Sequence, residues 1–337
     1  MTDPIKLSIC IPTYNFAVFI GQTLESIIPQ LAPDVEVVIL DGGSSDDTPK
    51  VVRTFLDCGL PISYVRQEFR GGIDRDMART VELARGEYCW LFSSDDIMKP
   101  GAVRTVLEEI QSGHDVYLCG LTLCDFDMNV ISEHPVSRAG HGEVFDLKRD
   151  ADRRRYFKLA ETTTALFSFM GSLIFKRERW HQHEIERGYI ESLWAHVVRL
   201  LRMIPNGLKV KYFGESLLYK RSGNDSFMER GLVHRYAMAI DGYHRIANDI
   251  FGARSFEARH IRRVLVNEFP PRIFFSLKQD SLKADRGAEI PEIDRLARKA
   301  YCDATVRSLA YLLDYRFSLT PICQKAKAIA KGIARKF

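Results

Sequence analysis

Long hydrophobic runs, paired cysteines and an excess of one charge sign are all missing from this 337-residue chain. The longest apolar stretch, residues 165–175, is too short and too interrupted to cross a bilayer. The first apolar run begins at Leu7 after a single lysine and has no small-residue cleavage site, so we expect no secretory leader. These absences predict a cytoplasmic protein that does not cross the membrane.

The seven cysteines are scattered, with no CxxC pair and no cysteine–histidine cluster of zinc spacing. This pattern is typical of a reduced chain whose thiols are small buried side chains. The 48 basic and 44 acidic residues leave a net charge of +4, which is too weak to predict nucleic-acid binding. A hydrophobic content of 46% is enough to fill a core, and we expect a catalytic core with an appended part.

Strand and helix patterns alternate through the first hundred residues. Strand-like runs occupy residues 7–15, 35–40, 61–67 and 87–92, with helical spacing at 18–31, 46–56 and 76–86. This order predicts an α/β fold with a mostly parallel, Rossmann-like sheet, whose ligands bind beyond the carboxyl ends of the strands. Further on, the spacing predicts a helix at 101–113, strands at 115–123, 162–175 and 208–221, and a helix at 188–203.

From about residue 231 the pattern is helical to the end, with an interruption at Pro270-Pro271. We therefore predict a catalytic domain over residues 1–228 and a helical region over residues 229–337. Within the first domain, residues 5–110 are predicted to hold the donor nucleotide and residues 111–228 the acceptor.

The first polar segment at the strand ends runs from Asp41 through two glycines and two serines to Asp46 and Asp47. Glycines let the backbone turn tightly and approach a ligand. An aspartate at a strand end suits a hydrogen bond to a base or a ribose, so we expect Asp41 to contact a ligand. For Asp46 and Asp47 we expect capping of the next helix.

The second segment, residues 70–76, is a charged glycine loop ahead of a helix. A helix N-terminus beside an arginine favours a diphosphate, which makes Gly72 and Arg75 candidates. Asp74 is a candidate for a ribose hydroxyl. A solvated loop in which Asp76 caps the helix explains the same residues equally well.

The third segment, Ser93-Ser94-Asp95-Asp96, directly follows the strand ending in WLF. Two adjacent carboxylates at the edge of a sheet repel each other unless a cation neutralises them. Mg²⁺ or Mn²⁺ prefers such hard oxygen ligands and bridges diphosphate oxygens. A β-turn with capping aspartates explains one carboxylate better than both.

Three motifs in register, LSICIPTYN, VEVVILDGGSSDDT and LARGEYCWLFSSDDIMKPGAV, resemble the N-terminal half of family-2 glycosyltransferases. The resemblance implies a GT-A fold and inverting transfer from a nucleoside-diphosphate sugar, usually with Mg²⁺ or Mn²⁺. It places Pro12, Tyr14 and Asp41 at positions that hold the nucleobase and ribose. Asp95 then matches the metal-binding end of the family's DxD motif, and Asp96 lies beside it among the donor-binding residues.

Two positions depart from the family pattern: Ser93 replaces the first Asp of DxD, and Gly42 replaces a second Asp in the turn. Four later segments, GGIDRDMARTVELARG, FMGSLIFKRERW, YIESLWAHV and LLYKRSGNDSF, resemble abequosyltransferase-like enzymes of bacterial surface-polysaccharide assembly. That likeness implies a glycan acceptor linked to a lipid such as polyprenyl diphosphate.

Inversion needs a general base for the acceptor hydroxyl, which the family takes from an ED-type motif ahead of a helix. Here YIESLWAH offers Glu191, and His196 is close enough on a helix to share the site. The alternatives are an exposed helix-start carboxylate and a core histidine. Lys220, Arg221 and Asn224, at or just after the end of the strand predicted at 208–221, are candidates to contact the diphosphate from the other side. Arg221 is the preferred candidate, and an ordinary surface lysine is the alternative for Lys220.

The last segment, residues 320–337, contains five basic and no acidic residues, with its apolar side chains on one helical face. Such a tail suits an anionic membrane surface, and a helix packed on the domain explains it equally well.

Two other functions stay open. A sugar nucleotidyltransferase is expected to carry a basic glycine-rich loop after the first strand, where this chain has PTYNFAVF. A non-catalytic, transferase-like binding protein fits Ser93 and the incomplete ED motif.

Overall fold

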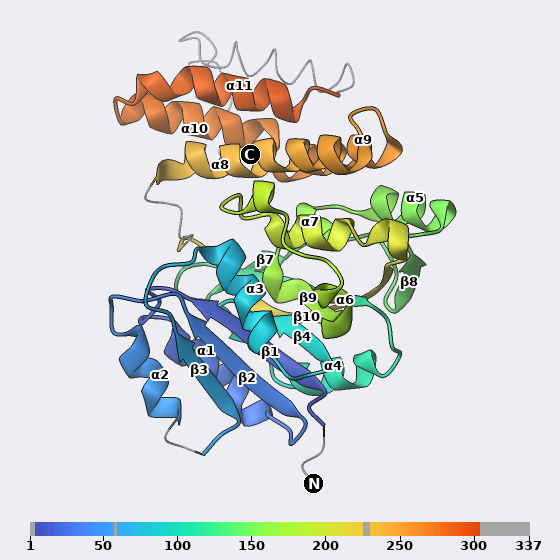
Figure 1. The fold of residues 1–337 in the computed structure, drawn as a ribbon. Helices are drawn as coiled ribbons and strands as arrows, with labels where there is room; N and C mark the ends of the chain where they lie inside the picture. Colours follow the sequence, from blue (N-terminus) through green and yellow to red (C-terminus); the bar gives the residue numbers. More distant parts are fainter. Residues whose placement is uncertain (1–3, 57–58, 225–229, 304–337) are drawn as a thin grey trace, which may run out of the picture. The chain divides into compact units, whose positions relative to one another are not determined.

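The computed structural model describes residues 4–56, 59–224 and 230–303. The chain divides into two compact units, residues 1–226 and 227–337 (Figure 1). The predicted amphipathic tail, residues 320–337, lies outside the described residues.

The N-terminal unit is built on one mixed sheet with the strand order β3-β2-β1-β4-β9-β6-β10-β5, and with β7 and β8 paired to β6 and β10. The first four strands of this order are parallel, and β9 then pairs antiparallel with both β4 and β6. The strands are β1 (Leu7–Thr13), β2 (Val35–Asp41), β3 (Ile62–Arg66), β4 (Tyr88–Leu91), β5 (Ile97–Met98), β6 (Val116–Cys124), β7 (Val130–Glu133), β8 (Glu143–Asp146), β9 (Leu173–Lys176) and β10 (Lys209–Arg221).

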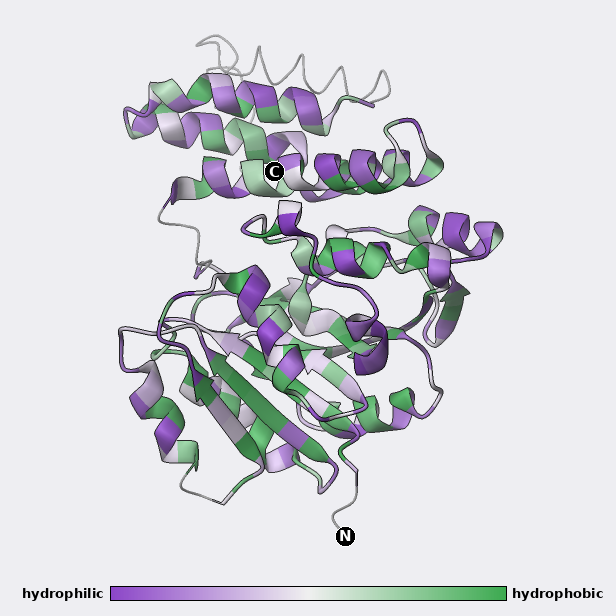
Figure 2. Ribbon diagram, in the orientation of Figure 1, coloured by the Kyte–Doolittle hydropathy of each residue, from purple (hydrophilic) through white to green (hydrophobic). Residues whose placement is uncertain are grey.

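Seven α-helices accompany the described strands of this unit: α1 (Ile20–Ile27), α2 (Thr48–Leu56), α3 (Ile73–Leu83), α4 (Ala102–Ile110), α5 (Asp150–Leu159), α6 (Arg177–His181) and α7 (Ala195–Leu201). Strands β1 and β2 are buried along their whole length, as expected of apolar strands covered on both faces. Figure 2 shows this as hydrophobic colouring along β2. The predicted α/β fold with a mostly parallel sheet beside helices is confirmed.

The order of the first four strands creates the site. The chain passes from β1 outward to β2 and β3, and then returns to β4 on the other side of β1. Such a reversal opens a crevice beyond the carboxyl ends of the strands, where α/β proteins bind ligands. The segments after β1, β2 and β4, which contain Tyr14, Asp41 and Asp95, therefore meet at one edge of the sheet.

Three predicted elements differ from the structure. The helix predicted at 76–86 is α3, which begins at Ile73 and ends at Leu83. Residues 162–175 form two 3₁₀ turns, Thr163–Leu166 and Met170–Ser172, and become a strand only at Leu173. Phe167 between the turns has a left-handed backbone (φ 69°), which a continuous strand does not allow. The helix predicted from residue 188 begins only at Ala195, because Glu191 and Leu193 are also left-handed.

The C-terminal unit is helical in its described part, as predicted. It contains α8 (Gly231–Ile246), a π-helical turn (Ala247–Phe251), α9 (Phe256–Glu268), α10 (Pro271–Lys283) and α11 (Ile290–Ala300). Pro270 precedes α10, which accounts for the interruption seen in the sequence. Among the described residues of the chain, no helix is long and apolar enough to cross a membrane.

Candidate active site

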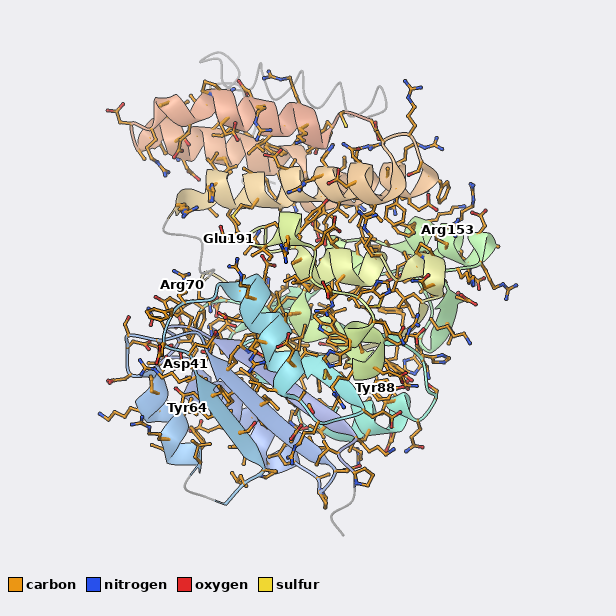
Figure 3. All side chains as sticks on the ribbon, in the orientation of Figure 1. Asp41, Tyr64, Arg70, Tyr88, Arg153 and Glu191 are labelled. Carbon is orange, nitrogen blue, oxygen red and sulfur yellow. The ribbon has the colours of Figure 1, made fainter. Side chains whose placement is uncertain are left out.

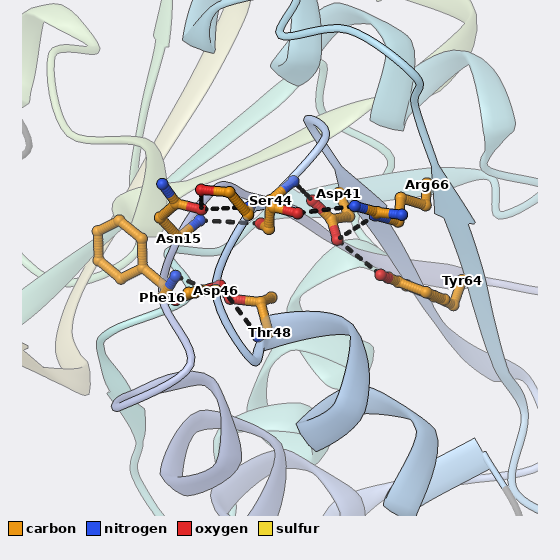
Figure 4. A network of polar contacts seen from close by, with 9 residues as sticks. Asn15, Phe16, Asp41, Ser44, Asp46, Thr48, Tyr64 and Arg66 are labelled. Carbon is orange, nitrogen blue, oxygen red and sulfur yellow. Dashed lines mark hydrogen bonds and ion pairs between the residues drawn. The ribbon is translucent and has the colours of Figure 1, made fainter.

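Asp41 ends β2 with its carboxylate fully buried (Figure 4). Its Oδ1 accepts a hydrogen bond from the Ser44 amide at 2.7 Å, and its Oδ2 accepts one from the Tyr64 hydroxyl at 2.6 Å. The Arg66 guanidinium lies 3.7 Å from the same Oδ2. Burial and the Asp41 carboxylate together raise the pKa of the Tyr64 phenol. Asp41 thus holds the turn after β2 through the Ser44 amide. A contact between Asp41 and a nucleoside stays a prediction.

Hydrogen bonds join the turn after β1 to the turn after β2, and together the two turns form one edge of the candidate site. Asn15 is left-handed (φ 57°); its amide donates to Ser44 Oγ at 2.9 Å and its side-chain oxygen accepts from the Ser45 amide at 2.8 Å. Asp46 accepts from the Thr48 amide at 3.0 Å, which confirms it as a helix cap, and from the Ala17 amide at 3.0 Å. These cross-connections hold the edge in one shape before a ligand arrives.

An aromatic and cationic pair lies beside this edge. Pro12 is buried in β1 opposite Leu40, and Tyr14 follows the end of the strand half-buried. The Arg70 guanidinium lies over the Tyr14 ring, 4.3 Å from its centre, a geometry typical of a cation–π contact. Arg70, rather than the predicted Arg75, is therefore the arginine of the 70–76 loop that contacts this edge.

The start of α3 carries two buried acids. Gly72 precedes the helix with φ 84°, and Asp74 and Asp76 lie in its first turn with little exposure. Asp76 accepts from Gln67 Nε2 at 2.7 Å, and burial raises its pKa. A Cβ placed on Gly42 would lie 2.7 Å from Asp76 Oδ2, so a side chain at position 42 would require the Asp76 carboxylate to shift. Two acids at this helix end disfavour the predicted diphosphate contact.

Asp74 binds the backbone of a distant loop. Its carboxylate accepts hydrogen bonds from the amides of Leu193 and Ala195, at 3.0 and 3.2 Å, and therefore faces the loop before α7. A contact between Asp74 and a ribose stays a prediction. Arg75 also points to this loop, with Nη1 3.6 Å from Glu191 Oε1. In Figure 3, Arg70 and Glu191 lie beyond the end of the sheet that carries Asp41, whereas Tyr88 marks the start of β4.

The acidic pair lies directly beyond β4. Asp95 accepts hydrogen bonds from the Ser93 hydroxyl and the Asn224 side-chain amide, and burial raises its pKa. Asp96 is 1% exposed; its Oδ1 accepts from the Arg221 amide at 2.9 Å, and its Oδ2 has no hydrogen-bond partner. Burial and the adjacent Asp95 charge raise the pKa of Asp96 well above its ordinary value. The positive charge near these two carboxylates is therefore too weak to compensate for their burial and mutual repulsion.

A divalent ion fits these residues only with help from a ligand. In the described parts of the chain, no group of three or more His, Cys, Asp or Glu side chains could hold a metal ion. Mg²⁺ is commonly bound by one or two carboxylates together with substrate phosphates. The carboxylate of Asp95 and the unpartnered Oδ2 of Asp96 match that incomplete donor set.

Comparison with known proteins gives the family. The model of the family described as "Glycosyl transferase family 2" matches residues 8–176, which span β1 to β9. The chain belongs to glycosyltransferase family 2. It is 30% identical to the abequosyltransferase RfbV of Salmonella typhimurium over 270 residues, covering 78% of this chain and 81% of the relative. It is 25% identical to a GalNAc(5)-diNAcBac-PP-undecaprenol beta-1,3-glucosyltransferase of Campylobacter jejuni, covering 58% and 60%.

Solved structures agree on the fold. TarS 1–349 of S. aureus in complex with UDP-GlcNAc superimposes with a TM-score of 0.57 at 17% identity, covering 88% of this chain and 82% of that one. The mannosyltransferase PcManGT of Pyrobaculum calidifontis, in complex with GDP-Man and Mn²⁺, superimposes with a TM-score of 0.54 at 15% identity, covering 97% and 86%. The chain is therefore a glycosyltransferase with the GT-A type of fold, as predicted, and such enzymes commonly use divalent metals.

Arg221 of this glycosyltransferase is part of the wall of the site. Its guanidinium is buried and donates to the carbonyls of Asp95, at 3.1 Å, and of Phe126, and to Gln22 Oε1 at 2.7 Å. It also lies over the Phe19 ring, 4.9 Å from its centre. These contacts hold the guanidinium in the ligand-free protein, and the contact between Arg221 and a diphosphate stays a prediction.

Lys220, the neighbour in β10, is better placed than the sequence indicates. Side chains alternate across a strand, so Lys220 and Arg221 point to opposite faces of the sheet. The Lys220 charge lowers the pKa values of both Asp95 and Asp96, against the larger effect of their burial. Its ammonium lies 5.3 Å from the centre of the Phe169 ring. Lys220 is therefore a cation whose charge acts on both carboxylates of the pair, and the Arg221 charge also lowers the pKa of Asp96.

Glu191 and His196, the two residues predicted to act in general-base catalysis, lie in different surroundings. Glu191 has a side chain that is 79% exposed, at the loop held by Asp74 and Arg75. His196 lies in α7 with 5% exposure, and burial lowers its pKa to about 4. A neutral, buried imidazole favours the alternative of a core histidine, so the structure does not bring His196 to Glu191 as a second base.

Proposed function

We propose that this family-2 glycosyltransferase moves a sugar, with inversion, from a nucleoside-diphosphate sugar to a lipid-linked glycan acceptor in bacterial surface-polysaccharide assembly. The observation that carries the donor half is the pair of half-buried Asp95 and buried Asp96, with the unpartnered oxygen of Asp96 at the carboxyl edge of the sheet. The names of the relatives support the acceptor half, because one is an abequosyltransferase and another acts on a glycan linked to undecaprenol.

On the donor side, the edge formed by Pro12, Tyr14 and Arg70 receives the base, and the turn organised by Asp41 receives the ribose. Asp95, with Asp96 beside it, would hold Mg²⁺ or Mn²⁺ at this end of the site. When bound there, the metal neutralises the charge that develops on the leaving diphosphate. Lys220 adds a second positive charge from the opposite side of the pair.

On the acceptor side, Glu191 takes the proton of the acceptor hydroxyl. The hydroxyl oxygen forms its new bond to the anomeric carbon as the bond between that carbon and the diphosphate oxygen breaks. The nucleoside diphosphate leaves with the bonding electrons, and the proton remains on Glu191. An exposed carboxylate fits this role, because the acceptor has to reach it from solvent.

A thermal-shift panel of nucleoside diphosphates, with and without Mn²⁺, tests the donor half. We expect at least one nucleotide to raise the Tm of the protein, and Mn²⁺ to increase that shift, because a ligand stabilises the state it binds. The Mn²⁺ increment is expected to disappear in Asp95→Asn and to persist in Asp47→Asn, an exposed carboxylate of the other turn. A panel in which no nucleotide binds would overturn the proposed function.

Glu191→Gln tests the base. Turnover is expected to fall by about 10²–10⁴-fold, the usual contribution of a general base, with the nucleotide thermal shift retained. Glu184→Gln removes another exposed carboxylate of the same region and serves as the control. Full turnover in Glu191→Gln removes Glu191 from the mechanism and leaves the donor half standing.

Residues 320–337 are proposed to attach the enzyme to the cytoplasmic face of an anionic membrane, where lipid-linked acceptors are presented. Their basic and apolar faces carry this part of the proposal. Flotation with anionic liposomes is expected to recover the full chain and to lose the chain that ends at residue 319. Equal flotation of both would overturn the membrane role.

A further inference from the structure

The loop that leads into α7 has a strained backbone. Glu191 and Leu193 have φ values of 71° and 72°, although neither is glycine. A left-handed backbone costs about 1–2 kcal/mol for an ordinary residue and persists only where the surroundings hold it. Two such residues on either side of Ser192 therefore require a specific anchor.

The anchor is the carboxylate of Asp74, which reaches the loop from a distant part of the chain. Asp74 is 3% exposed; its Oδ2 accepts from the Leu193 amide at 3.0 Å and its Oδ1 from the Ala195 amide at 3.2 Å. The amides of Glu191 and Ser192 also act on this carboxylate, lowering its pKa against the larger effect of burial. Successive amides in such turns form a concave anion site, filled here by a side chain of the same protein.

The next residue of α3 holds the side chain of the same glutamate. Arg75 Nη1 lies 3.6 Å from Glu191 Oε1 and donates to the Gly71 carbonyl at 3.2 Å. Asp74 therefore fixes the backbone of the loop, while Arg75 faces the carboxylate that the loop presents. The Arg75 pair is solvent-exposed and contributes little by itself, so the buried Asp74 carries most of the anchoring.

The same helix start also contacts the donor edge. Asp76, two residues further on, accepts from Gln67 and closes the space beside Gly42, and Arg70 lies over Tyr14. The first turn of α3 thus connects the nucleotide edge to the loop that carries the proposed base. We propose that Asp74 is a positioning residue, which holds the left-handed loop so that Glu191 faces the acceptor; this inference rests on the proposed role of Glu191.

Asp74→Asn tests the inference, because it keeps the size of the side chain but turns an N–H group toward the backbone amides. We expect kcat to fall by about 10²-fold, as for a small misplacement of a reacting group, with the donor KM and nucleotide thermal shift unchanged. Hydrogen exchange of the backbone over residues 190–196 is expected to become faster. Glu82→Gln, an exposed carboxylate on the same helix, is the control for all three measurements.

A double variant separates positioning from a general loss of structure. If Asp74 acts through Glu191, adding Asp74→Asn to Glu191→Gln lowers the residual kcat no further. A further fall of about 10²-fold in the double variant would show independent action and overturn the inference. Full turnover in Glu191→Gln alone would instead defeat the proposed base, whatever Asp74 does to the loop.

The wild-type enzyme provides a measurement that needs no variant. Amide exchange resolved to single residues is expected to show protection at Leu193 and Ala195, whose N–H groups bind the buried carboxylate. Exchange at these two amides as fast as in an unstructured peptide would overturn the inference, even if Asp74→Asn failed to fold.

Discussion

The two acidic segments that flank β1 end similar strands and have opposite surroundings. Asp41 is the last residue of β2 and has partners on both oxygens: an amide, a phenol and a guanidinium. Asp95 and Asp96 follow β4, where burial raises both pKa values and one oxygen of Asp96 has no partner. The chain satisfies the first segment internally and leaves the second short of positive charge.

The difference separates a structural use of carboxylates from a catalytic one. A carboxylate whose partners all come from the protein fixes a shape, and here it fixes the turn on which a nucleoside is expected to lie. A buried pair without enough partners destabilises the free protein and gains most when a cation and a diphosphate bind.

Among substitutions in the two acidic segments, the largest effect is expected for Asp95→Asn. Removing one charge of the pair removes the proposed metal ligand, which is worth several kcal/mol and corresponds to about 10²–10³-fold in turnover. The measurement is kcat with saturating Mn²⁺ and donor, and Asp47→Asn on the other segment is the control. Turnover at the wild-type level would show that the pair is as structural as Asp41.

Lys220→Met is expected to lower kcat/KM about tenfold, the usual size of one hydrogen bond to a charged group. Lys220→Arg keeps the charge and is expected to retain more of the activity. Arg221 differs from Lys220, because its guanidinium binds carbonyls of the wall; Arg221→Met is expected to lower the Tm. If Lys220→Met left kcat/KM unchanged, the lysine would have no role at the diphosphate.

Asp41→Asn and Asp96→Asn are expected to change stability in opposite directions. In Asp41→Asn an amide group faces donors such as the Tyr64 hydroxyl, at a cost of about 1–3 kcal/mol for the unsatisfied groups. Asp96→Asn removes a buried charge next to Asp95 and keeps the oxygen that accepts from Arg221, so the Tm of the free enzyme is expected to rise. A fall in the Tm of both variants would remove the contrast.

The smallest effect is in the pH dependence of the free enzyme. The folded-state pKa of Asp96 is raised above its ordinary value of 3.8, so the folded chain binds the proton more tightly than the unfolded chain. The stability from this proton is complete below pH 3.8 and is lost as pH rises through the folded-state pKa. The Tm advantage of Asp96→Asn over wild type is therefore expected to grow as pH is raised from acid to neutral. An advantage independent of pH would contradict a raised pKa.

Local sequence patterns predicted most of the strands and helices of the N-terminal unit. The apolar runs that became β1, β2 and β4 and the spacing of α1, α2 and α4 were readable because each run is short, buried and bounded by turn residues. The segment 188–203 was misread as one helix, since left-handed backbone at Glu191 and Leu193 has no signature in residue type. The Asp74 carboxylate, more than a hundred residues away in the chain, binds the amides of this segment.

The sequence by itself determined the family, the strand ends and the acidic pair, because these follow from local order and spacing. Only the tertiary structure decided what each charged residue faces. Lys220 and Arg221 are adjacent in the sequence and lie on opposite faces of β10, with one toward the acidic pair and one within the wall. A charge acquires its role from the partners that fold around it, and those partners come from segments far away in the chain.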